Sequence, residues 1–87
     1  MTTRESLERF ISECQQTMDY ARAHLIEGSR QQHYDDVGYT NAQLELEECY
    51  NELMKLYQSA NAQQREQLHR LRLQIQALQN EMTLLEH

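Results

Sequence analysis

Apolar residues recur along this chain at alternating steps of four and three positions, the spacing that brings side chains to one face of an α-helix. The clearest of these stripes lies within residues 40–60 and consists of Ala42, Leu46, Cys49, Leu53, Leu56 and Ala60. A β-strand would need alternation with a period of two, which this segment lacks. The pattern predicts a helix over about residues 40–58, with Thr40 as its N-terminal cap.

Two further stripes precede and follow this one. The first consists of Leu7, Ile11, Cys14, Met18, Ala21 and Leu25, and the last of Leu68, Leu71, Ile75, Leu78 and Met82. They predict helices over about residues 3–27 and 61–83. Thr2 and Glu5 have the spacing of a capping box at the first helix, and Gly28 is the residue type that commonly closes a helix.

The segments between the stripes predict two connections of different length. Residues 28–39 interrupt the pattern and contain the turn formers Asp35, Asp36 and Gly38, so we expect the main loop there. The last stripe is out of phase with the middle one by one residue. A tight turn within residues 59–64, in which Ser59 or Asn61 caps a new helix and Gln64 lies three positions after Asn61, accounts for that slip better than one continuous helix.

These elements predict an all-α protein with a single domain over residues 1–84. The expected architecture is a three-helix antiparallel bundle, up-down-up, with coiled-coil-like packing. The alternative is a long helical hairpin that dimerises to complete a core in which many apolar side chains are small. Residues 85–87, Leu-Glu-His, match the start of a Leu-Glu-polyhistidine tail and are interpreted as a vector-derived remnant.

Composition narrows the classes of function. The 87 residues carry a net charge of −6 and no proline, which disfavours a nucleic-acid partner and favours uninterrupted helices. No run approaches the roughly 18 apolar residues of a membrane span, and the charged N-terminus lacks the apolar segment of a signal peptide. We therefore expect a cytoplasmic protein without membrane contact, and no feature of the sequence indicates a cofactor or a small-molecule ligand.

The two cysteines both lie in apolar stripes. If the first two helices meet around residues 25 and 42, Cys14 faces the neighbourhood of Leu53, and Cys49 lies about one helical turn (about 6 Å) away along the axis. We therefore expect two reduced thiols that serve as small core residues in a reducing compartment.

A metal site is disfavoured by ligand spacing. Cys14, Cys49, His24 and His33 are the candidate zinc ligands, but no C-x-x-C or H-x-x-x-H pair brings any two of them together. His24 is expected instead to cover apolar surface at the edge of the first helix.

A polar cluster formed by His33, Asp35 and Asp36 lies in the predicted loop. Such a cluster suits proton transfer or weak cation binding, and the alternative function is a ligand-binding or metal-binding protein or an enzyme that uses this loop. A thin helical bundle offers little volume for a water-excluding pocket, however, so we expect turn and cap roles, with Tyr39 packed over the end of the bundle.

Arg65, Arg70 and Arg72 form a basic patch on the last predicted helix. A second alternative function is therefore the binding of an anionic partner. We expect pairing within the chain instead, with Glu48 and Glu52 of the acidic middle helix in reach of Arg72 or His69, as weak surface ion pairs.

The surface of the last helix is rich in uncharged amides. Gln67 and Gln74 lie beside its apolar stripe, where an amide is buried at lower cost than a charged group, and Arg72 lies nearby. We expect these three residues to form the partner-contact face of a non-enzymatic protein that interacts with another protein or with itself.

Two segments carry motifs that are similar to those of a known family. Residues 28–47 contain the H-Y-D-D motif from His33 to Asp36, and residues 63–80 contain the Q-Q-R-E-Q-L motif from Gln63 to Leu68. On these motifs the chain resembles the YtzC-like family of small uncharacterised proteins of bacilli and related spore-forming bacteria. The family carries no assigned activity, cofactor or catalytic residue, so the resemblance implies a bacterial cytosolic source and no particular chemistry.

Overall fold

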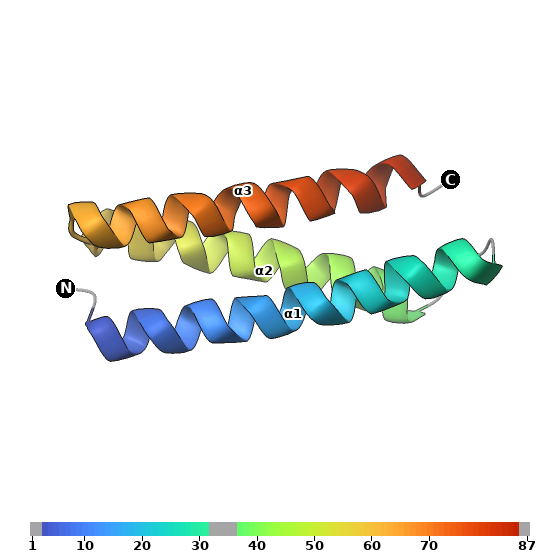
Figure 1. Cartoon of the computed structure of the whole chain (residues 1–87), viewed down its shortest axis with the longest axis horizontal. Coiled ribbons are helices and arrows are strands. Elements are labelled where there is room, and N and C mark those ends of the chain that lie inside the picture. Colours follow the sequence, from blue (N-terminus) through green and yellow to red (C-terminus); the bar gives the residue numbers. More distant parts are fainter. Residues whose placement is uncertain (1–2, 32–36, 86–87) are drawn as a thin grey trace.

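The structure, a computed structural model, describes residues 3–31 and 37–85, which fold into three α-helices. These are α1 (Arg4–Gln31), α2 (Val37–Ser59) and α3 (Ala62–Leu85). They run up, down and up in a rod 44 Å long, and each packs against the other two (Figure 1). The all-α three-helix bundle is confirmed, and the hairpin with one unbroken second arm does not form.

The core consists mainly of the expected stripes. Phe10 replaces Ile11 on α1, and on α2 Tyr39 joins the core while Cys49 and Leu56 are only partly buried at its edge. The core comprises Leu7, Phe10, Cys14, Met18, Ala21 and Leu25 of α1, Tyr39, Ala42, Leu46 and Leu53 of α2, Ala60, and Leu68, Leu71, Ile75, Leu78 and Met82 of α3. Phe10 is 9% exposed, whereas Ile11 is only half-buried at the edge of the core. A helix that faces two partners buries a wider sector than one stripe, and the larger phenyl ring covers more of the seam.

The second connection is the tight turn expected from the phase slip. Helix α2 ends at Ser59 and α3 begins at Ala62. The Asn61 side-chain oxygen accepts a hydrogen bond from the Gln64 amide (2.8 Å), and the Gln64 side chain accepts one from the Asn61 amide (3.0 Å). This reciprocal pair is a capping box, so of the two expected caps, Ser59 and Asn61, it is Asn61 that begins α3.

The ends of the helices differ from expectation at three places. Helix α1 continues through Gly28 to Gln31, and α2 begins at Val37 instead of after Thr40. At the start of α1, the Thr3 hydroxyl accepts the hydrogen bond from the Ser6 amide (3.1 Å), so the cap is one residue later than the expected pair of Thr2 and Glu5. Thr2 itself lies outside the described residues.

The early start of α2 has its physical reason in Tyr39. This side chain is 1% exposed, and it precedes Ala42 and Leu46 by three and seven residues, so it extends the buried stripe by one turn only if the backbone is already helical there. The Tyr39 hydroxyl donates a hydrogen bond to the backbone carbonyl of Met82. That carbonyl belongs to the last turn of α3, where carbonyls find no donor within the helix, so Tyr39 supplies the missing partner. The expectation that Tyr39 packs over the end of the bundle is confirmed.

Helices α1 and α2 approach each other closely at Gly38, where the His24 ring lies against the glycine. A Cβ atom at Gly38 would lie 2.2 Å from Cε1 of His24, whose ring stacks edge-on with Tyr20 at a centroid distance of 4.5 Å. Gly38→Ala should therefore destabilise the protein by about 1 kcal/mol, because the imidazole must leave its position. In a His24→Ala background the same change should stabilise it by about 0.5 kcal/mol, because alanine favours helix over glycine.

Urea unfolding of the four proteins of this cycle measures the reversal of sign. A change of equal sign and size in both backgrounds would show that the His24 ring does not limit residue 38. Leu25, the buried residue next to His24, is not changed in any of the four proteins, so the core contact of this turn of α1 is the same in all of them.

Candidate functional site

The two cysteines meet across the packed seam of α1 and α2. The Cys14 thiol is fully buried, the Cys49 thiol is half-buried, and both are free. Burial, a side-chain hydrogen bond with Cys49 and the nearby charge of Glu13 together raise the pKa of the Cys14 thiol far above its ordinary value. The core role expected for these thiols is confirmed for Cys14, and Cys49 packs against the core from its edge.

The thiols are closer than the sequence suggests, because the register of the two helices differs from the expected one. The expected register, in which Cys14 faces Leu53, is wrong by about one turn. Helix α1 continues past Gly28, so His24 lies level with Gly38, and by the same register Cys14 lies level with Cys49.

A shallow groove between α1 and α2 opens beside Cys49. It is lined by Phe10, Glu13 and Thr17 of α1 and by Glu45, Glu48, Cys49 and Glu52 of α2. Four of these seven residues are glutamates, so the groove carries a strongly negative potential. We call it the Cys49 groove.

The position of Glu48 and Glu52 corrects the expected pairing with the basic patch. Both glutamates face α1 across the Cys49 groove, on the side of α2 away from α3. Among the described residues, Arg70 pairs with Glu66 of its own helix at 2.8 Å, and Arg72 donates to Nδ1 of His69 at 2.9 Å. Arg70 and Arg72 therefore interact with residues of α3 itself, whereas Glu48 and Glu52 line the groove between α1 and α2.

Arg65 has a structural role at the end of α2. Its Nε donates to the carbonyl oxygen of Tyr57 (3.0 Å) and its Nη2 to that of Gln58 (3.4 Å), and its guanidinium carbon lies 5.1 Å from the centroid of the Tyr57 ring. These carbonyls are in the last turn of α2, where the helix provides no donor for them. Arg65 thus caps α2, and the three arginines do not converge on one anion site.

The expected partner-contact face is divided by the fold. Gln67 and Gln74 are exposed on one side of α3, and Gln67 lines a polar groove with Arg4, Leu7 and Glu8 of α1. Arg72 is half-buried, and its Nε is buried with no hydrogen-bond partner among the described residues. Residues two positions apart point to nearly opposite sides of a helix, so Arg72 does not share the surface of Gln74.

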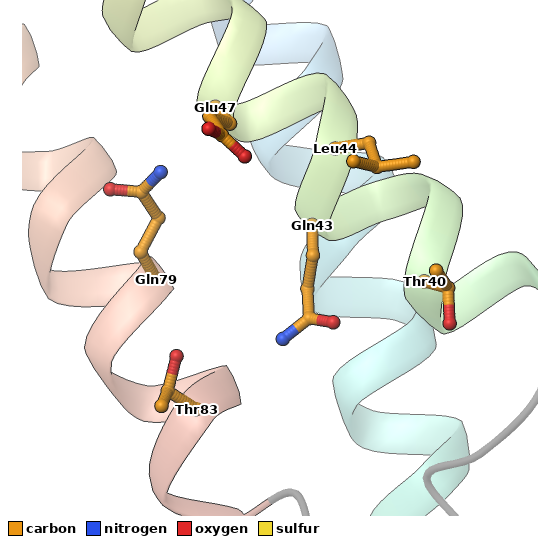
Figure 2. Close-up of a pocket in the computed structure, with 6 residues that line it drawn as sticks. All are labelled: Thr40, Gln43, Leu44, Glu47, Gln79 and Thr83. Atoms are coloured by element: carbon orange, nitrogen blue, oxygen red, sulfur yellow. The ribbon is translucent and has the colours of Figure 1, made fainter.

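A second polar groove lies between the first half of α2 and the second half of α3. It is lined by Thr40, Gln43, Leu44 and Glu47 of α2 and by Gln79 and Thr83 of α3 (Figure 2). The Gln43 side chain extends toward α3, whereas Leu44 projects away from it. Hydroxyls, amides and one carboxylate suit hydrogen bonding to a polar chain.

Two further candidates from the sequence are a metal site and the polar loop cluster. Residues 3–31 and 37–85 hold no group of three or more His, Cys, Asp or Glu side chains that could bind a metal ion. His33, Asp35 and Asp36 lie outside the described residues, so their role stays a prediction.

Within the described part of the chain, no helix combines the length and the apolar composition that crossing a bilayer requires.

The outer surface of α3 carries a second stripe that sequence reasoning missed. Leu73, Ala77, Asn80 and Leu84 are all exposed and follow one another at steps of four, three and four. Leu73 is 51% exposed and Leu84 is 76% exposed. The signal is present in the sequence, but the stronger core stripe of the same helix obscures it. We call these four residues the outer stripe.

Comparison with known proteins places the chain among proteins without an assigned role. Residues 1–84 match a family described as "Protein of unknown function (DUF2524)". The chain is 50% identical over 84 residues to "Uncharacterized protein YtzC" of Bacillus subtilis (strain 168), across 97% of this chain and 93% of that protein. No solved structure matches it. The resemblance carried by His33–Asp36 and Gln63–Leu68 is confirmed.

Proposed function

The chain belongs to the DUF2524 family, whose description assigns no role, and we propose that it is a non-enzymatic interaction module that pairs with a second copy of itself through the outer stripe of α3. The observation that carries this proposal is the exposure of Leu73 and Leu84 at heptad-like spacing on a helix whose core face is already filled. Apolar side chains at such spacing on an exposed helix favour docking of another helix.

The absence of charge along this surface supports an interface. Residues 73–80 form an uncharged run between Arg72 and Glu81. The centres of protein interfaces are depleted in charged residues, because a buried charge loses its hydration and an interface seldom offers interactions that offset this cost. Asn80 adds a group that can form hydrogen bonds within the seam, and Ala77 is small enough to allow two helix backbones to approach closely.

The order of residues in the outer stripe favours a second copy over an unrelated helix. In an antiparallel pair of α3 helices related by a two-fold axis, Leu73 of one copy lies against Leu84 of the other, and Ala77 lies against Asn80. The stripe therefore maps onto itself, as a two-fold interface requires. In the same arrangement Glu81 meets Gln76, so no like charges face one another.

The grooves support a role without catalysis. Those beside Cys49 and between α2 and α3 are open to solvent, whereas catalysis and small-molecule binding generally use concave sites that exclude water. We assign the protein to the cytoplasm, since two free cysteines packed in a seam suit a reducing compartment.

Light scattering on reduced protein over a wide concentration range tests the pairing. We expect the mass to rise from monomer to dimer with concentration, and Ala77→Glu should raise the dissociation constant at least about tenfold, or about 1.4 kcal/mol, because it buries two like charges near the two-fold axis. Ala23→Glu is the matched control, since Ala23 is exposed on α1, and it should leave the association unchanged.

Two results would contradict the proposal. A monomer at every concentration would exclude self-association, and the uncharged surface of α3 would then have to serve a different protein. A dimer that Ala77→Glu and Ala23→Glu affect equally would place the interface elsewhere on the bundle. Circular dichroism of both variants establishes that the helices remain folded.

A further inference from the structure

The seam of α1 and α2 places two thiols of unequal accessibility side by side. Cys14 has no exposed surface, whereas Cys49 is half-buried and lines the Cys49 groove. The α1 residues in that groove, Phe10, Glu13 and Thr17, surround Cys14 along the helix. Cys49 therefore faces the turn of α1 that carries Cys14, independently of the hydrogen bond between the two thiols.

We propose that Cys14 and Cys49 form a redox modification site, at which a small uncharged hydroperoxide produces a reversible disulfide between α1 and α2. This inference is independent of the pairing through α3, because the thiols lie on the α1–α2 seam and the outer stripe lies on the far side of α3.

The different exposure of the thiols determines the order of the reaction. Cys49 is reached first: its sulfur attacks one oxygen of the hydroperoxide, the O–O bond breaks, and the thiol proton leaves with the alcohol or water that is released. Cys49 is then a sulfenic acid. The Cys14 sulfur attacks the Cys49 sulfur, the S–O bond breaks, and water leaves with the Cys14 proton. In total, two thiols lose two electrons and one hydroperoxide is reduced.

The charge of the groove selects the oxidant. Glu13, Glu45, Glu48 and Glu52 surround the approach to Cys49. A negative potential repels anionic oxidants such as oxidised glutathione and does not repel neutral hydrogen peroxide. Salt screens this repulsion, so the reaction with oxidised glutathione should accelerate as ionic strength rises, while the reaction with hydrogen peroxide should not change.

The environment of Cys14 makes the second step slow. Burial and the hydrogen bond with Cys49 raise the pKa of the Cys14 thiol, so this group is protonated at neutral pH and is a weak nucleophile until its proton is removed. The disulfide would tie residues 14 to 49 into a closed loop and hold α1 against α2.

Intact mass spectrometry of the reduced full chain treated with hydrogen peroxide tests the proposal. We expect wild-type protein to lose two hydrogen atoms within one chain and to regain them with dithiothreitol. Cys14→Ser should instead gain oxygen on Cys49, because the resolving thiol is missing. Cys49→Ser should react at least about tenfold more slowly than wild type, because the buried Cys14 must wait for local opening of the helices.

Three outcomes would overturn the proposed disulfide between Cys14 and Cys49. The first is a gain of oxygen on wild-type Cys49 without loss of hydrogen, and the second is a disulfide that joins two chains. The third is a Cys49→Ser variant that reacts as fast as wild type. Cys14→Ala accompanies Cys14→Ser, since a buried hydroxyl can disturb the core, and circular dichroism establishes that each variant is folded. As an independent measurement, the urea midpoint of the oxidised wild-type protein should exceed that of the reduced protein, and an equal or lower midpoint would contradict the proposed link between α1 and α2.

Discussion

Leu53→Ala should lower the free energy of unfolding by about 3 kcal/mol, because it removes a fully buried side chain from a core with few layers. A domain of this size has a total stability of about 5–10 kcal/mol, so this one change removes a large part of it. Leu53 lies in the second half of α2, which packs against both α1 and α3 (Figure 1). Urea unfolding followed by circular dichroism measures the loss.

Met54→Ala is the matched control, since Met54 is the next residue on the same helix and is 37% exposed. It removes a comparable volume from the surface, and we expect a loss below about 1 kcal/mol. Equal losses in the two variants would mean that α2 does not present Leu53 to the core, and the packing of the three helices would then be wrong.

Tyr39→Phe should lower the free energy of unfolding by about 1–2 kcal/mol, because the Met82 carbonyl then has no donor from α2. The phenyl ring still fills the site, so the loss reports on the hydrogen bond more than on packing. The effect should be concentrated in the last turn of α3, whose terminal carbonyls depend on partners from outside the helix. Amide hydrogen exchange near the C-terminus of α3 should accelerate more than exchange in its first half.

Tyr20→Phe removes a phenolic hydroxyl from a side chain that is 40% exposed, and it should change stability by less than about 0.5 kcal/mol. If Tyr39→Phe costs no more than this control, the hydroxyl of Tyr39 does not stabilise the end of α3. Faster exchange throughout α3 in Tyr39→Phe would indicate a general loss of packing in place of a local loss of the cap.

Two helix ends in this protein are completed by side chains from a neighbouring helix. Tyr39 of α2 serves the last turn of α3, and Arg65 of α3 serves the last turn of α2. Both interactions tie neighbouring helices together at opposite ends of the same seam. With the capping box at Asn61, they explain how a chain with a thin core defines where its helices lie against one another.

The α1–α2 seam that holds the cysteines and the outer stripe of α3 are separate surfaces. Oxidation of Cys14 and Cys49 should leave the association through the outer stripe unchanged, because the α1–α2 seam does not include Leu73 or Leu84. Light scattering on oxidised and reduced protein therefore checks the independence of the two sites with material that both experiments already require.

The sequence by itself determined the number of helices, their buried faces and the turn at Asn61. These features depend on interactions within a few residues. The 4-3 spacing relates residues on neighbouring turns of one helix, and the capping box joins residues three positions apart. For the same reason, the sequence identified Cys14 as a core thiol and Gln67 and Gln74 as exposed. It also contained the outer stripe, and the structure added that neither of the other two described helices covers it.

Only the tertiary structure decided the register of the helices, and with it the ends of α1 and α2 and the contacts between them. The ends depend on the free energy that each helix gains by packing against the other. Helix α1 therefore continues past Gly28, and α2 begins at Val37, early enough for Tyr39 to be helical and buried. That register brought Cys14 to Cys49 and turned Glu48 and Glu52 toward α1. Such pairings join residues more than thirty positions apart, and their free energy depends on the fit of whole helix faces, which no local pattern contains.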